Sequence, residues 1–192
     1  MNKQFKFSII MSVYNVEPYI EEAVRSILNQ TIGFEENVQI IFVNDGSVDN
    51  SGQICKKYQS LYPSNIAYIE QENKGLSAAR NAGLEVASGS YINFFDSDDI
   101  LSSNTLKEVD LFFEEYGLSV DFATIPLVYF EAQNGLHAKY KPLGKRNCVI
   151  NLSNKPNGFV LSSAGSFYKS SVFEKIRFDE SLLNFEDAKV NM

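Results

Sequence analysis

The chain has 192 residues, with 17 lysines and arginines against 24 acids, and its formal net charge is −7. Hydrophobic residues make up 44 %, including 15 Phe and 10 Tyr, which excludes a disordered acidic tail. The acidic balance argues against nucleic acid or an anionic membrane surface as partner, because both require a positive field. A local basic pocket for one phosphorylated ligand stays compatible with it, and the length suits one domain or one domain plus part of a second.

The two cysteines, Cys55 and Cys148, occur without a CxxC or Cys/His spacing, so we expect a reducing, cytoplasmic location and no catalytic cysteine. Cys55 is interpreted as a half-buried helix side chain. No stretch approaches the roughly 18 apolar residues of a membrane span. Peripheral contact with the inner face of a membrane, through parts of a longer protein, is left open.

Short apolar runs alternate with helix-like segments along the first half of the chain. The runs typical of buried strands are residues 7–13, 38–43, 66–69 and 91–95. Helical segments are expected from Pro18 to about Leu28 and over residues 51–61, 76–87 and 103–116. Strand-helix alternation at this spacing predicts an α/β fold with a mainly parallel central sheet flanked by helices.

The pattern changes after residue 121. Residues 122–130 are a strand candidate, 134–156 an exposed excursion, 165–168 a short strand and 171–175 a helical turn. Residues 188–192 resemble the start of a helix and carry no stop signal. We therefore expect a chain cut from a longer protein.

Polar side chains follow each of the first four predicted strands. Ligands of an open parallel sheet bind beyond the carboxyl ends of its strands, so these side chains should converge on one rim. They are Tyr14, Asn15, Asp45, Asn73, Asp96 and Asp98.

The segment Asp96-Ser97-Asp98-Asp99 places three carboxylates within four residues. They repel one another unless a cation or hydrogen-bond donors compensate, and Mg²⁺ typically binds one or two carboxylates together with substrate phosphates. The segment thus indicates a metal diphosphate site. An alternative interpretation is a helix N-cap, because a helix is expected soon afterwards.

Three further groups each have a functional and a structural interpretation. Asp45 is either an Asx-turn residue or an acceptor for a base N–H, and Arg80 is either a surface arginine or a partner for phosphate or aspartate. The pair Glu186-Asp187 is either a solvated acidic pair or the source of a general base. His137 is the single histidine and lies in the polar excursion, which argues against a Ser/His/Asp triad and excludes a multi-histidine zinc site.

Four motifs in order resemble the family 2 glycosyltransferases with the GT-A fold: SVYN at 12–15, VNDGSVD at 43–49, NKGLSAARN at 73–81 and FDSDD at 95–99. The segments LNQT at 28–31 and FED at 185–187 are also similar. The resemblance is specific over about the first hundred residues and weaker beyond them.

The resemblance implies a role for each matching residue. Ser12 and Tyr14 would line the base pocket, with Asp45 bonded to the base, commonly uracil. Asn73 and Arg80 would complete the nucleotide site. Asp96 would contact the nucleotide, and Asp98 would bind the Mn²⁺ or Mg²⁺ that bridges the diphosphate. Asp187 would be the general base that deprotonates the acceptor hydroxyl, with inversion at the anomeric carbon.

Residues 1–192 are then expected to form a single GT-A domain, with a nucleotide-binding half (1–100) and an incomplete acceptor-side half (101–192). Family members often carry a further metal or diphosphate ligand beyond the late acidic motif, whereas this chain ends five residues after Asp187. We therefore expect weak nucleotide binding and slow turnover from this chain alone.

The implied reaction is the metal-dependent, inverting transfer of a hexosyl or N-acetylhexosaminyl group. The donor is a nucleotide-diphosphate sugar, with UDP favoured, and the acceptor is a hydroxyl of a glycan, lipid-linked or cell-wall polymer. The sugar, the exact acceptor and the oligomeric state are left open. Two alternatives are a sugar nucleotidyltransferase and a non-catalytic nucleotide-binding module. A nucleotidyltransferase would be expected to carry a Gly-rich loop after the first strand, whereas residues 12–18 contain no glycine.

Overall fold

The computed structural model describes residues 4–129, 135–136, 164–181 and 190–191. His137, Cys148, Glu186 and Asp187 lie outside the described residues, as does most of the predicted excursion at 134–156.

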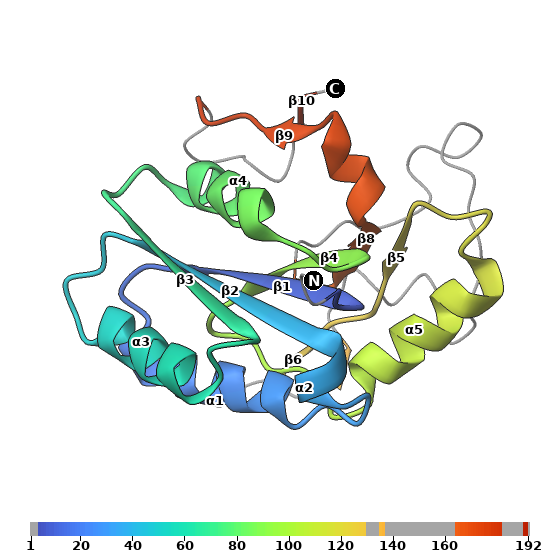
Figure 1. Cartoon of the computed structure of the whole chain (residues 1–192), viewed down its shortest axis with the longest axis horizontal. Coiled ribbons are helices and arrows are strands. Elements are labelled where there is room, and N and C mark those ends of the chain that lie inside the picture. Colours follow the sequence, from blue (N-terminus) through green and yellow to red (C-terminus); the bar gives the residue numbers. More distant parts are fainter. Residues whose placement is uncertain (1–3, 130–134, 137–163, 182–189, 192) are drawn as a thin grey trace.

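A six-stranded mixed sheet forms the centre of the chain (Figure 1), with strand order β3-β2-β1-β4-β8-β5. The strands β3, β2, β1 and β4 run parallel to one another, and β8 is antiparallel to both β4 and β5. Their bounds are β1 Phe7–Val13, β2 Val38–Asp45, β3 Ile66–Gln71, β4 Tyr91–Asp96, β5 Phe122–Thr124 and β8 Ser166–Lys169. The predicted α/β fold with a mainly parallel sheet is therefore confirmed.

Helices cover both faces of the sheet (Figure 1). On one face lies α4 (Leu76–Val86), followed along that side by the 3₁₀ helix η2 (Ser170–Glu174) and the short strand β9 (Arg177–Phe178). On the other face lie α1 (Glu17–Leu28), α3 (Ser51–Leu61), α5 (Thr105–Tyr116) and the four-residue α2 (Phe34–Asn37), which was not predicted.

The core is two apolar layers, one on each face of the sheet. Because successive strand side chains point to opposite faces, Ile9 and Met11 pack against α1, α3 and α5, whereas Ile10 packs on the α4 side. The apolar face predicted for α1 is buried at Ile20, Ala23, Val24 and Ile27. Full burial of the first strand explains its uninterrupted apolar run.

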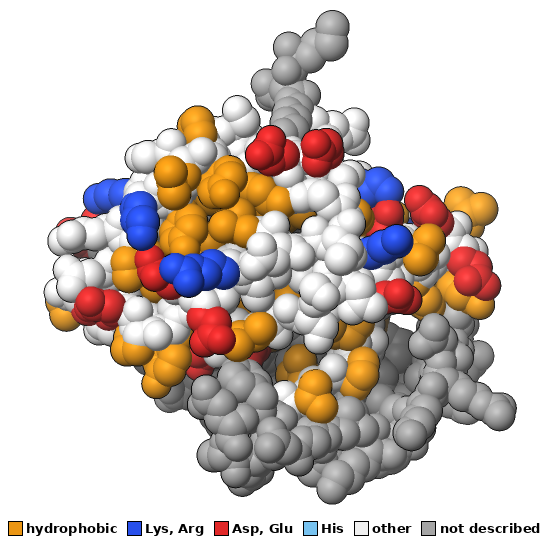
Figure 2. Space-filling view, turned by 90° about the horizontal axis from the view of Figure 1, so that it is seen from below, with side chains coloured by type: hydrophobic (Ala, Val, Ile, Leu, Met, Phe, Trp, Pro, Cys, Tyr) orange, Lys and Arg blue, Asp and Glu red, His pale blue; other side chains and the backbone are white. Residues whose placement is uncertain are grey.

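The face that carries α1 and α3 is shown in Figure 2. Hydrophobic side chains gather there between positive and negative ones. Glu21 of α1 pairs with both Lys57 of α3 and Arg25 of its own helix. On this face, charges of the two signs are therefore interspersed. In the described part of the chain, no helix has the length and apolar character needed to cross a bilayer.

Several sequence expectations need correction. The strand candidate at 122–130 is two short strands, β5 and β6 (Val128–Tyr129), and Pro126 between them has no N–H to donate to a ladder. β6 pairs with β7 (Gly135–Leu136). The helix start expected at 188–192 is wrong for Val190–Asn191, which form β10 and pair antiparallel with β9. Cys55 is fully buried, and burial raises the pKa of its thiol to about 12.

We predict that Gly83→Ala destabilises the fold, because a Cβ at this position would lie 2.4 Å from Cγ2 of Ile10. Ile10 is buried and β-branched, so it has little freedom to move aside. We expect a loss of about 1–3 kcal/mol in the free energy of unfolding, measured by urea denaturation. Glu85→Ala, at a more exposed position of the same helix, should change it by less than about 0.5 kcal/mol. Equal stability of the Gly83 variant and the wild type would contradict this packing.

Candidate functional site

The sheet register brings predicted site residues side by side at the carboxyl ends of the parallel strands. Ser12 of β1 lies beside Asp96 of β4, and Asp45 of β2 lies beside Gln71 of β3. Adjacent parallel strands thus supply a continuous rim, as expected for the ligand side of such a sheet.

Asp45 is the most buried acid of this rim, with 4 % exposure. Its Oδ1 accepts hydrogen bonds from Gln71 Nε2 at 2.7 Å and from the Lys74 N–H at 2.9 Å, and its Oδ2 accepts one from the Gly75 N–H at 2.9 Å. Gly75 immediately precedes α4, so the carboxylate lies where the helix dipole favours an anion. Asp45 therefore holds the loop after β3 and the start of α4.

Gly46 allows the loops after β2 and β3 to approach each other. Its φ is +77°, and a Cβ there would lie 2.9 Å from the backbone nitrogen of Asn73. Asn73 itself is exposed at the rim. The position requires glycine both for its backbone conformation and for the close approach.

The loops after β1 and β2 are joined by reciprocal hydrogen bonds. Asn15, whose φ is +52°, accepts from the Val48 N–H at 2.9 Å through Oδ1 and donates its own N–H to Ser47 Oγ at 3.2 Å. The neighbouring Tyr14 ring is 52 % exposed. These bonds fix the backbone that presents Tyr14 at the rim.

Asp49 links the starts of two helices on this side of the sheet. One of its oxygens accepts from the Glu17 N–H at the start of α1, and the other from the Ser51 N–H at the start of α3. Burial opposes ionisation, but hydrogen bonds from the Ser51 side chain and from backbone N–H groups outweigh it and lower the pKa of Asp49.

Arg80 is buried to 2 % exposure and is not a surface arginine. One guanidinium nitrogen lies 3.9 Å from Asp96 Oδ1. The guanidinium carbon is 5.8 Å from the ring centre of Phe94 and 5.2 Å from that of Phe178, so two neighbouring aromatic rings contact the cation from one side. The small residues around it, Ser77, Ala78 and Ala79, are buried against the sheet.

The acidic segment after β4 is ordered by Ser97, which donates its hydroxyl to the Ser12 carbonyl at 2.8 Å. Asp98 is exposed, whereas burial and then the Asp98 charge raise the pKa of Asp99. Among the described residues, no group of three or more metal-binding side chains surrounds a common point. The solvent-accessible carboxylates of Asp96 and Asp98 still fit a hard cation that takes its other ligands from phosphates and water.

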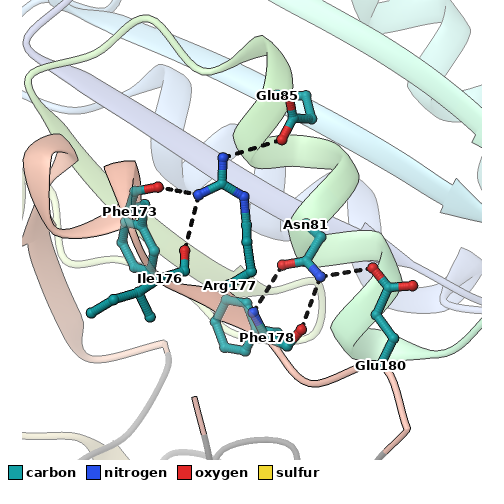
Figure 3. A network of polar contacts seen from close by, with 7 residues as sticks. All are labelled: Asn81, Glu85, Phe173, Ile176, Arg177, Phe178 and Glu180. Atoms are coloured by element: carbon teal, nitrogen blue, oxygen red, sulfur yellow. Dashed lines mark hydrogen bonds and ion pairs between the residues drawn. The ribbon is translucent and has the colours of Figure 1, made fainter. Parts of the chain in front are cut away.

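A second polar network ties α4 to the β9 segment (Figure 3). The Asn81 side chain donates to the Phe178 carbonyl at 3.0 Å and accepts from the Phe178 N–H at 3.0 Å, and it also donates to Glu180 at 2.8 Å. Arg177 pairs with Glu85 at 3.2 Å and donates to the carbonyls of Phe173 and Ile176.

The structure thus brings Ser12, Asp45, Arg80 and Asp96 to one end of the parallel strands, with Tyr14, Asn73 and Asp98 exposed on the loops that follow. Asp187 lies outside the described residues. Sequence reasoning missed the supporting roles of Gln71, Asp49 and Asn81, whose partners lie far away along the chain. Asn81 was within a recognised motif, but only the three-dimensional contact reveals its partner.

A family model described as Glycosyl transferase family 2 matches residues 8–177. The chain belongs to this family. Its relatives from Bacillus subtilis include the minor teichoic acid biosynthesis proteins GgaB and GgaA, which are 42 % and 41 % identical to it. The alignments cover 97 % and 95 % of this chain but only 20 % and 41 % of those proteins.

The structure of S. aureus TarS 1–349 in complex with UDP-GlcNAc matches this chain with a TM-score of 0.79 and 28 % identity. The match covers 95 % of this chain and 51 % of TarS 1–349. The chain therefore has the GT-A fold and spans about half or less of these relatives.

We predict that Asp45→Asn destabilises the protein in the absence of any ligand. An amide cannot accept from all three donors, because its NH₂ group would face an N–H. We expect a loss of about 1–3 kcal/mol in the free energy of unfolding, measured by urea denaturation. Asp98→Asn is the matched control, and it should change stability by less than about 0.5 kcal/mol because Asp98 is exposed. Equal effects of the two substitutions would refute the organising role of Asp45.

Proposed function

We propose that this chain is the donor-binding part of an inverting, metal-dependent glycosyltransferase that uses a UDP-sugar. The observation that carries the proposal is that Asp45 at the end of β2 and Asp96 at the end of β4 lie on the same edge of the parallel sheet, with Arg80 of α4 beside Asp96. These groups offer an acceptor for a base and a cation for a diphosphate within one rim.

Asp45 has the hydrogen-bonding capacity to recognise uracil. An ionised carboxylate offers about four acceptor positions, and three are occupied by Gln71, Lys74 and Gly75. The remaining position, on Oδ2, suits the single imide N–H of the base. Ser12 would line the same pocket, Asn73 would complete the nucleotide site, and the exposed Tyr14 ring offers a surface on which a base can stack.

The diphosphate would lie over Asp96 and Asp98, with Arg80 fixed behind Asp96. Asp98 would hold Mn²⁺ or Mg²⁺, with Asp96 in contact with the nucleotide. The metal would act as a Lewis acid that stabilises the negative charge developing on the nucleoside diphosphate leaving group. Arg80 contributes a second, permanent positive charge, whose position is set by Phe94 and Phe178.

Asp187 would deprotonate the acceptor hydroxyl, because an alcohol is a weak nucleophile without a base within hydrogen-bond reach. The names of the GgaB and GgaA relatives favour a cell-wall polymer of the teichoic acid type as acceptor. The complex of TarS with UDP-GlcNAc favours an N-acetylhexosaminyl donor. A nucleotidyltransferase is disfavoured by the family to which the chain belongs.

We expect this chain to bind UDP in the presence of Mn²⁺, measured by titration calorimetry. Asp98→Ala should weaken that binding by at least about tenfold, equivalent to about 1.4 kcal/mol. Glu85→Ala, an acid on α4 away from the rim, serves as the control and should leave the affinity unchanged. Failure of this chain to bind UDP or any other nucleoside diphosphate would refute the donor site.

We expect Asp187→Asn to separate binding from chemistry. The amide cannot accept the acceptor proton, so kcat should fall by about 10²- to 10⁴-fold, while the Kd for UDP and Mn²⁺ stays within about twofold. The measurement is UDP release from UDP-GlcNAc with teichoic-acid-type acceptors, using a longer chain that contains this domain. An unchanged kcat would remove Asp187 from the mechanism. Release of pyrophosphate from a nucleoside triphosphate would instead favour the nucleotidyltransferase.

A further inference from the structure

The Asn81 side chain pairs with Phe178 in the way that one strand pairs with another. Its oxygen accepts from the Phe178 N–H and its nitrogen donates to the Phe178 carbonyl, both at 3.0 Å (Figure 3). The residues are 97 positions apart in the chain. A carboxamide is suited to satisfy both backbone groups of one residue, because it carries one acceptor and one donor in a plane.

The Phe178 ring is in turn one wall around Arg80. It is 7 % exposed, and its centroid lies 5.2 Å from the Arg80 guanidinium carbon. The ring also meets Phe94 edge to face at 4.8 Å, so the two rings form one aromatic surface against the guanidinium. Fixing the backbone of Phe178 therefore fixes one of the two rings on which the cation rests.

We propose that Asn81 is a positioning residue for Arg80: through Phe178 it sets where the guanidinium stands relative to Asp96. The consequence for ligand affinity rests on the donor site proposed above. Asn81 follows Arg80 directly on α4, so one helical turn carries both the cation and the group that closes its surroundings. An aspartate would keep the shape but lose the donor, and its charge would face the Phe178 carbonyl and Glu180.

The ion pair between Glu85 and Arg177 provides a matched comparison. It ties the same two segments together at 3.2 Å, with the Arg177 side chain 41 % and the Glu85 side chain 68 % exposed, so its contribution to stability is small. The pair involves Arg177 and makes no bond to Phe178. Removing it therefore tests whether loss of a contact between α4 and β9 that does not involve Phe178 disturbs the Arg80 surroundings.

Arginine side-chain NMR tests this directly, because the chain has only four arginines, Arg25, Arg80, Arg146 and Arg177. The Arg80 Nε–Hε signal, assigned by its loss in Arg80→Lys, should be displaced by the two neighbouring rings and protected from exchange. We expect Asn81→Ala and the isosteric Asn81→Asp to shift this signal and speed its exchange. Glu85→Gln should move the Arg177 signal and leave that of Arg80 in place.

Asn81→Ala and Asn81→Asp should each weaken UDP binding with Mn²⁺ about tenfold, the effect typical of removing a residue that orients a ligand-binding group without touching the ligand. Glu85→Gln should leave the affinity unchanged. In a Phe178→Leu background, Asn81→Ala should have little further effect, since the ring through which it acts is gone. An Arg80 signal unchanged in both Asn81 variants overturns the proposal whether or not nucleotide binds. A shifted Arg80 signal in a protein that binds no nucleoside diphosphate supports it and refutes the donor site alone.

Discussion

The burial of the Arg80 guanidinium is the constraint on which the site end of this fold depends. A cation that has lost its hydration costs several kcal/mol unless other groups replace the water. Two neighbouring aromatic rings lie against it on one side, and Asp96 lies 3.9 Å away. For that charge to be tolerated, α4, β4 and β9 must meet in a fixed arrangement. The Asp96 side chain is 45 % exposed, so this pair links the buried cation to the solvent-facing end of the parallel strands.

Asp45 provides the complementary charge at the start of the same helix. Its carboxylate accepts from the loop after β3 and from the Gly75 N–H, so it anchors the α4 end nearest the strand termini. An anion there gains from the helix dipole and satisfies the N–H groups of Lys74 and Gly75, which lead into the helix. Close packing of Gly83 on Ile10 fixes the other half of the helix against β1. The position of Arg80 is thus determined from both ends of α4.

The regular elements were predictable because their signals are local. The helix at 51–61 and the strand at 7–13 have the bounds expected from apolar periodicity. Predictions failed where pairing with a distant segment decides the structure, as at Val190–Asn191, which a neighbouring strand makes extended. The burial of Arg80 and the partner of Asn81 were not predicted from the sequence either, because both depend on Phe178, almost a hundred residues further along the chain.

The helix α4 joins the two halves that the sequence suggested. Its first turns contribute Arg80 and rest on Asp45, whereas Asn81 and Glu85 bind the segment that continues past Phe178. Any shift of that segment would therefore reach the Phe178 ring before it reached the donor rim. Because packed aromatic rings and a two-sided carboxamide bond tolerate little displacement, the shift would be felt at Arg80. In this arrangement the segment around Phe178 is coupled to the rim of the parallel strands through one buried cation.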